Sequence, residues 1–141
     1  MRSFRFYLTA VFTFFIAWVI YEADSHSTNI FFSSVGAIPY GDKIGHFVLY
    51  GLLAMFFDWS FNFKSRLLFG YNIPFSALVI LGFAVIEEFT QILLESRNFD
   101  LVDILFDFLG MWFFIRIGRL SFWQRFSFLI TPPEKTGRGK Y

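Results

Sequence analysis

Polar and ionisable side chains recur from His46 to Asp107, within and between long apolar runs. His46 and Glu88 are the candidate catalytic residues, because an imidazole and a carboxylate in apolar surroundings can act as general base and general acid. The candidate ligand-binding residues are Tyr50, Gln91, Arg97, Asp100, Asp103 and Asp107. Arg97 is the expected counter-ion, since its guanidinium can bind one carboxylate bidentately or turn toward a phosphate.

The spacing of these residues places them on common helix faces. His46 and Tyr50 are four residues apart, and Glu88 and Gln91 are about one turn apart. Asp100, Asp103, Asp107 and Gly110 form one helical stripe, in which Asp100 also fits simple helix capping and Gly110 favours close helix approach. Glu87 is expected on a different part of its helix from the closest neighbours of Gln91, where it could form a second clamp, and it is left outside the site.

Structural roles compete with chemistry at the same positions. His46 could be a neutral imidazole hydrogen-bonded to a carboxylate of the helix that carries Glu88. Glu88 and Gln91 could form an interhelical clamp, although such contacts contribute only about 0.6 kcal/mol on average in membranes. That small gain favours function over a purely structural role for Glu88.

Other chemistries fit the sequence poorly. No cysteine is present, which excludes thiolate nucleophiles and Cys-ligated metals. No metal or other cofactor is predicted, because no closely spaced histidine pair exists and His26 lies in a separate loop. Hydrolysis would need Ser96 or the Ser33-Ser34 pair. No nucleic acid partner is expected for an acidic site.

The elements that position these residues are apolar runs long enough to cross a bilayer. The chain has 141 residues, of which 56% are hydrophobic and 24% aromatic, too apolar for a soluble domain of this size. Four runs of about 17 to 22 residues approach the ~20 needed for a span. The spans are expected at about 4–21, 44–61, 73–94 and 101–117. The predicted fold class is therefore an all-α membrane protein with a four-helix transmembrane bundle.

Local signals mark the ends of these helices. Asp42 is expected to cap the second helix, and Pro74 fits the first turn of the third. The first run suits a retained span better than a signal peptide, because no small-residue pair precedes a plausible cleavage point. Residues 1–120 form one predicted domain. Residues 121–141 are expected to be an interfacial amphipathic segment followed by a flexible tail, which Pro132-Pro133 separates.

Basic residues indicate the orientation of the bundle. Ten of the twelve lie near the chain ends or between the second and third helices: Arg2, Arg5, Lys64, Arg66, Arg116, Arg119, Arg125, Lys135, Arg138 and Lys140. Only Lys43 and Arg97 lie in the other two connections. The positive-inside rule therefore puts both termini in the cytoplasm and the polar site at the outer face. The inner halves of the helices are expected to be apolar.

The motifs from Asp42 to Gly110 resemble those of a known family. Asp42-Lys43-x-x-His46-Phe-x-x-Tyr50, followed by Glu88-x-x-Gln91, Arg97, Asp100-x-x-Asp103 and Gly110, resembles the VanZ-like family. The resemblance implies a small multi-span bacterial inner-membrane protein from a family named for a teicoplanin-resistance protein. Asp107 departs from this pattern, since the family usually has Asn before the glycine.

Two functional classes remain open at this point. In the first, the outer cluster binds or processes a lipid or a lipid-linked cell-envelope precursor, with a link to glycopeptide tolerance. In the second, the cluster only locks the bundle, and the protein is a non-enzymatic scaffold that acts through a partner. Proton-linked transport fits less well, because it normally needs ionisable groups on both sides of the midplane. No residue pattern specifies a reaction, so the sequence leaves open whether the protein is an enzyme.

Overall fold

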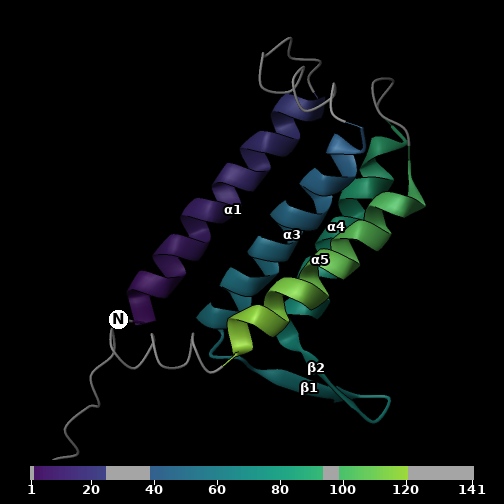
Figure 1. Cartoon of the computed structure of the whole chain (residues 1–141). Helices are drawn as coiled ribbons and strands as arrows, with labels where there is room; N and C mark the ends of the chain where they lie inside the picture. Colours follow the sequence, from purple (N-terminus) through teal and green to yellow (C-terminus); the bar gives the residue numbers. More distant parts are fainter. Residues whose placement is uncertain (1, 25–38, 94–98, 121–141) are drawn as a thin grey trace, which may run out of the picture.

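Four helices and one β-hairpin make up the protein in a computed structural model, which describes residues 2–24, 39–93 and 99–120. The elements are α1 (Arg2–Asp24), α3 (Gly41–Ser60), β1 (Ser65–Leu68), β2 (Tyr71–Pro74), α4 (Phe75–Gln91) and α5 (Leu101–Arg119). Successive helices run in opposite directions, and α3 lies between α1 and the α4–α5 pair (Figure 1). The four predicted helices are confirmed, while the segment 121–141 lies outside the described residues.

The β-hairpin was not predicted, and it shortens the third helix. Strands β1 and β2 pair antiparallel, with Leu68 opposite Tyr71 and Ser65 opposite Pro74. Between them, Phe69 and Gly70 both have positive φ angles, of 52° and 81°, as a two-residue hairpin turn requires. Helix α4 therefore begins at Phe75 rather than 73, and Pro74 precedes the helix instead of lying in its first turn.

The predicted caps of α3 and α5 have different outcomes. Tyr40, with a left-handed φ of 62°, occupies the cap position of α3, so the prediction for Asp42 is wrong. Asp42 lies in the first turn, where its negative charge interacts favourably with the helix dipole. The prediction for Asp100 is confirmed, since its side chain accepts a 2.8 Å hydrogen bond from the backbone N–H of Val102. Asp103 follows in the first turn of α5.

Helices α3 and α5 have the most extensive contact in the bundle, and glycines allow it. A Cβ atom on Gly110 would overlap the backbone carbonyl of Phe47, and one on Gly51 would lie 2.8 Å from the Gly110 carbonyl oxygen. The predicted role of Gly110 in close helix approach is therefore confirmed. Small residues have this role between helices in membranes, where close backbone packing replaces the hydrophobic driving force.

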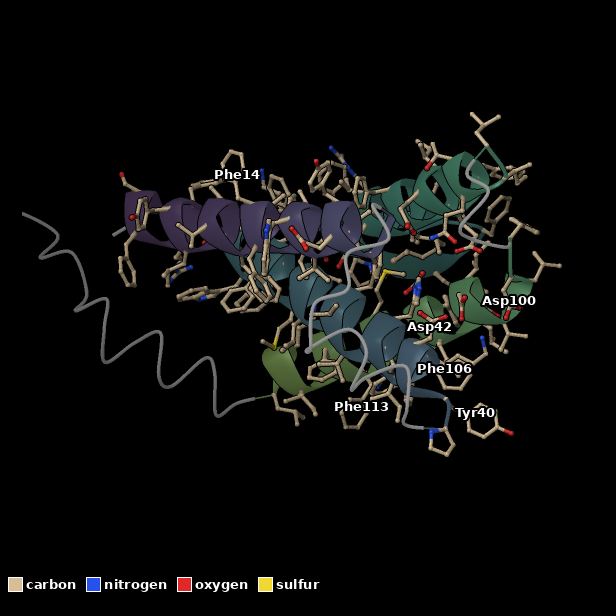
Figure 2. All side chains as sticks on the ribbon, turned by 90° about the horizontal axis from the view of Figure 1, so that it is seen from above. Phe14, Tyr40, Asp42, Asp100, Phe106 and Phe113 are labelled. Carbon is tan, nitrogen blue, oxygen red and sulfur yellow. The ribbon has the colours of Figure 1, made fainter. Side chains whose placement is uncertain are left out.

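The interior of the bundle is more polar than its surface. The buried apolar residues are Ile16, Tyr50, Leu53, Ala54, Ile80, Ala84, Met111 and Ile115. A longer set of polar and charged residues is also buried: Thr9, His46, Asp58, Ser60, Ser76, Glu87, Glu88, Gln91, Asp103 and Asp107. Large apolar side chains such as Phe14 and Phe113 point away from the bundle (Figure 2). Polar groups inside and apolar groups outside are what a lipid environment favours.

Within the described residues, one helix is long and apolar enough to cross a membrane, over Ser3–Ala23 of α1. Helix α4 has 17 residues, and the other two helices carry charged residues near both ends. Many of these charges face the interior rather than the surface. The fold class is thus confirmed as helical with four helices, whereas the four spans stay a prediction.

The two ends of the bundle differ in their side chains. At the hairpin end, defined by the start of α1, the end of α3 and the β-hairpin, Thr9 and Ser60 hydroxyls lie 2.6 Å apart. Asp58 is also buried there, and it accepts hydrogen bonds from Arg119 and from the Ser76 hydroxyl. The expectation that the inner helix halves are apolar is therefore wrong. A single aspartate among phenylalanines gave no sequence signal for its partner, which lies 61 positions later.

Candidate functional site

The opposite end of the bundle gathers polar side chains from three helices. They come from the first turns of α3, the last turns of α4 and the start of α5, and we call them the polar cluster. Its members are Lys43, His46, Tyr50, Glu87, Glu88, Gln91, Asp100, Asp103 and Asp107. The structure thus brings together seven of the eight predicted site residues, and Arg97 lies outside the described residues.

Lys43 joins α3 to the start of α5. Its ammonium nitrogen donates to Asp100 Oδ2 at 2.7 Å and to Asp103 Oδ1 at 2.8 Å. The hydrogen bond from Lys43 holds the pKa of Asp100 below its usual value, and the Val102 backbone N–H acts in the same direction. Sequence reasoning missed this role of Lys43 and gave it to Arg97. The available signal was the position of Lys43 three residues before His46, on the same helix face.

His46 pairs with Asp107 rather than with a carboxylate of α4. Its Nδ1 lies 3.1 Å from Asp107 Oδ1, and both side chains are buried. The imidazole also stacks on the Tyr50 ring, with centroids 5.7 Å apart and planes 3° from parallel. The proposed structural alternative for His46 was therefore right about a carboxylate partner and wrong about the helix that supplies it.

Glu87 belongs to the cluster although the sequence analysis excluded it. Its Oε2 accepts from the Tyr50 hydroxyl at 3.2 Å, and its Oε1 accepts from Gln91 Nε2 at 2.6 Å. Gln91 was expected to work with Glu88, but a spacing of four residues aligns it with Glu87. That spacing was the signal that could have found Glu87.

Glu88 connects α4 to the residue that caps α5. Its Oε1 accepts a 2.6 Å hydrogen bond from the Asp100 backbone N–H, while its Oε2 has no hydrogen-bond partner among the residues that the structure describes. Asp107 Oδ2 is likewise buried and unpartnered. A buried acceptor without a donor costs about 1–3 kcal/mol. Two such oxygens in one cluster lack hydrogen-bond donors or a cation, which a ligand would supply.

The cluster contains a histidine oriented by a carboxylate, as in a general base, but, among the described residues, no serine that could act as its nucleophile. A carboxylate beside Nδ1 fixes the tautomer and orientation of an imidazole, as Asp107 does for His46. The described serines are Ser3, Ser60, Ser65 and Ser76, and all of them lie toward the hairpin end. Ser96 and the Ser33-Ser34 pair lie outside the described residues.

A mixed group beside His46 has ligand atoms suited to a metal ion. One ligand atom each from Asp42, His46 and Asp103 lies within 4.8 Å of the others. The sequence predicted no metal because it offered no histidine pair. The second carboxylate comes from a helix that begins almost sixty residues later, so its proximity to His46 could not be read from spacing.

Comparisons with known proteins add a relative and a family. The chain is 33% identical over 88 residues to the uncharacterised protein C11E3.10 of the fission yeast Schizosaccharomyces pombe, a match that covers 60% of this chain and 50% of the relative. The chain thus spans about half the length of that relative. No solved structure matches it. The model of the VanZ/LLP1 family matches residues 3–122, which include all four helices and the polar cluster. The chain therefore belongs to the VanZ/LLP1 family.

Proposed function

We propose that this protein spans the membrane four times and that its polar cluster binds the headgroup of a lipid or a lipid-linked cell-envelope amphiphile. The observation that carries the proposal is the pair of buried, unpartnered oxygens, Glu88 Oε2 and Asp107 Oδ2, on helices with apolar outer surfaces. A carboxylate oxygen is a hydrogen-bond acceptor, so the headgroup that fits these two oxygens carries hydroxyl or ammonium donors. We assign Arg97 to the phosphate of the same headgroup.

Four spans are supported by where each helix keeps its polar residues. On α5, Asp103 and Asp107 are buried, while Leu105, Phe108 and Trp112 are exposed. The charges that lower the mean hydropathy of α3 and α5 therefore face other helices, and the surface offered to lipid stays apolar. The family is membrane-associated, and α1 alone satisfies the length and composition of a span.

The orientation follows from the charge difference between the two ends. Basic side chains concentrate at the hairpin end: Arg5, Lys64, Arg66, Arg116 and Arg119. Several of them contact aromatic rings, as when the Arg5 guanidinium lies 5.1 Å from the centre of the Trp59 ring. Arginine beside tryptophan suits the headgroup boundary on the cytoplasmic side. The polar cluster then opens toward the outer face.

The cellular setting is part of the proposal. We place the protein in a bacterial cytoplasmic membrane, where a lipid-linked envelope precursor would connect the cluster to glycopeptide tolerance. The fission yeast relative shows that similar sequences also occur outside bacteria. A ligand present in both kinds of membrane, such as a phospholipid with an ammonium or hydroxyl headgroup, therefore fits the family better than a precursor found only in bacteria.

A non-enzymatic scaffold is the second candidate, and one observation favours it. Lys43, Tyr50, Gln91 and the Asp100 backbone N–H all donate to carboxylates of the same chain, so the network partly satisfies itself. Such a network would hold three helices together without a ligand. The protein would then act through a partner protein.

Native mass spectrometry of the detergent-purified protein distinguishes the two candidates. We expect the wild type to retain a defined lipid and Glu88→Gln to lose it. The amide oxygen of glutamine would still accept from the Asp100 backbone N–H, so its NH₂ group would replace the acceptor Oε2 that faces the ligand in this proposal. Glu22→Gln is the control, since it makes the same change at the end of α1. If the lipid is retained equally by all three, or by none while Glu88→Gln melts earlier, the binding proposal fails and the cluster is structural.

A further inference from the structure

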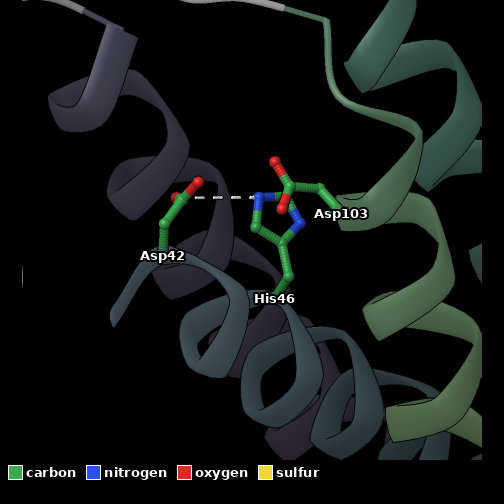
Figure 3. A group of neighbouring side chains, drawn as sticks. All are labelled: Asp42, His46 and Asp103. Atoms are coloured by element: carbon green, nitrogen blue, oxygen red, sulfur yellow. Dashed lines mark ion pairs between the residues drawn. The ribbon is translucent and has the colours of Figure 1, made fainter. Parts of the chain in front are cut away.

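We propose that Asp42, His46 and Asp103 form a binding site for a divalent transition-metal ion. The three residues come from the first turn of α3, the following turn of the same helix and the first turn of α5. Their side chains converge at the edge of the polar cluster, with the Asp42 carboxylate beside the His46 ring and Asp103 reaching the ring from α5 (Figure 3). The site does not depend on lipid binding.

The three ligand atoms lie slightly farther apart than ligands that share one ion. His46 Nε2 lies 4.0 Å from Asp42 Oδ1, beyond hydrogen-bond range, and one ligand atom from each of the three residues lies within 4.8 Å of the others. Two ligands bound at ~2.0–2.2 Å can be at most about 4.4 Å apart. The Asp42 side chain is 59% exposed, so a small rotation would bring it into range.

Asp107 prepares His46 for this role. With Asp107 Oδ1 accepting from Nδ1–H at 3.1 Å, the lone pair of the imidazole is on Nε2, which faces Asp42. Histidine ligands in metal sites usually donate their other ring N–H to a carboxylate in this way, which fixes the ring and raises its basicity. Among the described residues, the buried Asp107 is hydrogen-bonded to His46 alone, and this role accounts for a carboxylate at a position where the VanZ-like resemblance leads one to expect Asn.

The charge of the cluster also calls for a cation. Six carboxylates lie in or directly beside the polar cluster among the described residues: Asp42, Glu87, Glu88, Asp100, Asp103 and Asp107. Only Lys43 and His46 among the described members of the cluster can carry positive charge. Two carboxylate oxygens remain buried without a hydrogen-bond partner, on Glu88 and Asp107. A divalent ion held by Asp42, His46 and Asp103 would offset part of the negative charge of the cluster.

The ligand types select the ion. One imidazole with two carboxylates suits Zn²⁺ or Mn²⁺, whereas Mg²⁺ and Ca²⁺ prefer oxygen ligands alone. Three protein ligands leave at least one coordination position open for water or for an oxygen of a ligand. Lys43 competes with the ion, because its ammonium group is 2.8 Å from Asp103 Oδ1.

The test is metal titration of the full chain, purified in detergent and stripped with a chelator. Isothermal titration with ZnCl₂ and electron paramagnetic resonance with MnCl₂ should each show one saturable site. Asp42→Asn should weaken binding at least tenfold and lower the melting temperature of the metal-free protein only slightly, because the exposed Asp42 contributes to the fold mainly through the helix dipole. Glu22→Gln, which removes the same charge from the end of α1, should bind as the wild type does. No saturable binding by the wild type, or equal binding by Asp42→Asn, would overturn the proposal.

Lys43→Gln is a second test, in which the affinity for Zn²⁺ is expected to rise rather than fall. Removing the ammonium group frees Asp103 and removes a repelling charge, so the folded variant should bind Zn²⁺ more tightly than the wild type. Weaker binding by this variant, with its helical circular dichroism intact, would contradict the arrangement. A variant that merely perturbs the fold would not gain affinity, so the two outcomes are distinct.

Discussion

Arg119 binds Asp58 with both arms of its guanidinium, through Nε to Oδ2 at 2.6 Å and through Nη2 to Oδ1 at 2.7 Å. Asp58 is 1% exposed and also accepts from the Ser76 hydroxyl at 3.1 Å. The pair joins the end of α3 to the end of α5, far along the bundle from the polar cluster. Bidentate pairing of this kind fixes geometry as well as energy.

Arg119→Gln should lower the free energy of unfolding by about 3–5 kcal/mol, because it leaves the buried Asp58 carboxylate without its counter-charge. Chemical denaturation in detergent, followed by circular dichroism, measures the change. The double variant Asp58→Asn with Arg119→Gln should recover part of the loss, since no charge then remains buried at that point. Additive losses in the double variant would show that the pair contributes nothing as a pair.

Gly110→Ala should destabilise the bundle by about 1–3 kcal/mol, the usual cost of overpacking, because the added methyl group would overlap the Phe47 carbonyl. Gly82→Ala is the matched control. A Cβ at Gly82 would meet nothing within 4 Å, so this substitution should be neutral or slightly stabilising through helix propensity. The melting temperatures of the two variants, each compared with that of the wild type, measure this difference. Equal effects at both positions would mean that α3 and α5 do not cross at Gly110.

Tyr40→Cys and Tyr71→Cys should be labelled from opposite sides of the membrane. Both tyrosines are 75% exposed, one before α3 and the other on the hairpin. The chain has no cysteine of its own, so each variant has a single thiol. In intact spheroplasts an impermeant maleimide should reach position 40 and not position 71, whereas inverted vesicles should give the reverse. Labelling of both positions from one side would rule out the four-span topology.

Acidification should remove the stabilising effect of the Asp100 charge. Lys43 lowers the pKa of Asp100 in the folded state, so this contribution is complete above the usual aspartate pKa of about 3.9 and is lost as the pH falls through the lower folded value. Asp100→Asn can still cap α5 and isolates the charge. Its melting temperature should be below that of the wild type at pH 7 and should approach it at low pH. The pH dependence of this difference should disappear in a Lys43→Gln background.

The sequence predicted the helices and the positions of the site residues along them because each depends on local patterns. Apolar runs, the Asp100 cap and the three- and four-residue spacings of α5 are all readable within one helix. The partners of these residues depend on contacts between helices, and local spacing does not contain them. Lys43 therefore replaced Arg97 as the described counter-ion of Asp100, and Asp107 replaced an α4 carboxylate as the partner of His46.

The hairpin shows a second limit of sequence interpretation. Residues 65–74 are exposed or half-buried, and their turn uses Phe69 and Gly70 rather than an Asn-Gly or Asp-Gly pair. Without that signal, Ile73 and Pro74 read as the start of an apolar helix. Glu87 was missed for a different reason. Gln91 lies three residues after Glu88 and four after Glu87, and both spacings place side chains on one helix face, but only Glu87 accepts a hydrogen bond from Gln91.

The division of partners between α3 and α5 has a consequence for how the chain is made. Asp58, His46 and Lys43 emerge from the ribosome on α3, and Arg119, Asp107 and Asp103 follow only with the last helix. If the chain spans the membrane four times as proposed, α3 carries ionisable groups without their α5 partners during that interval, and its transfer from an insertion channel into lipid has a large energetic cost. Insertion of α3 is therefore expected to be delayed until α5 arrives, so that the two helices enter the bilayer as a pair.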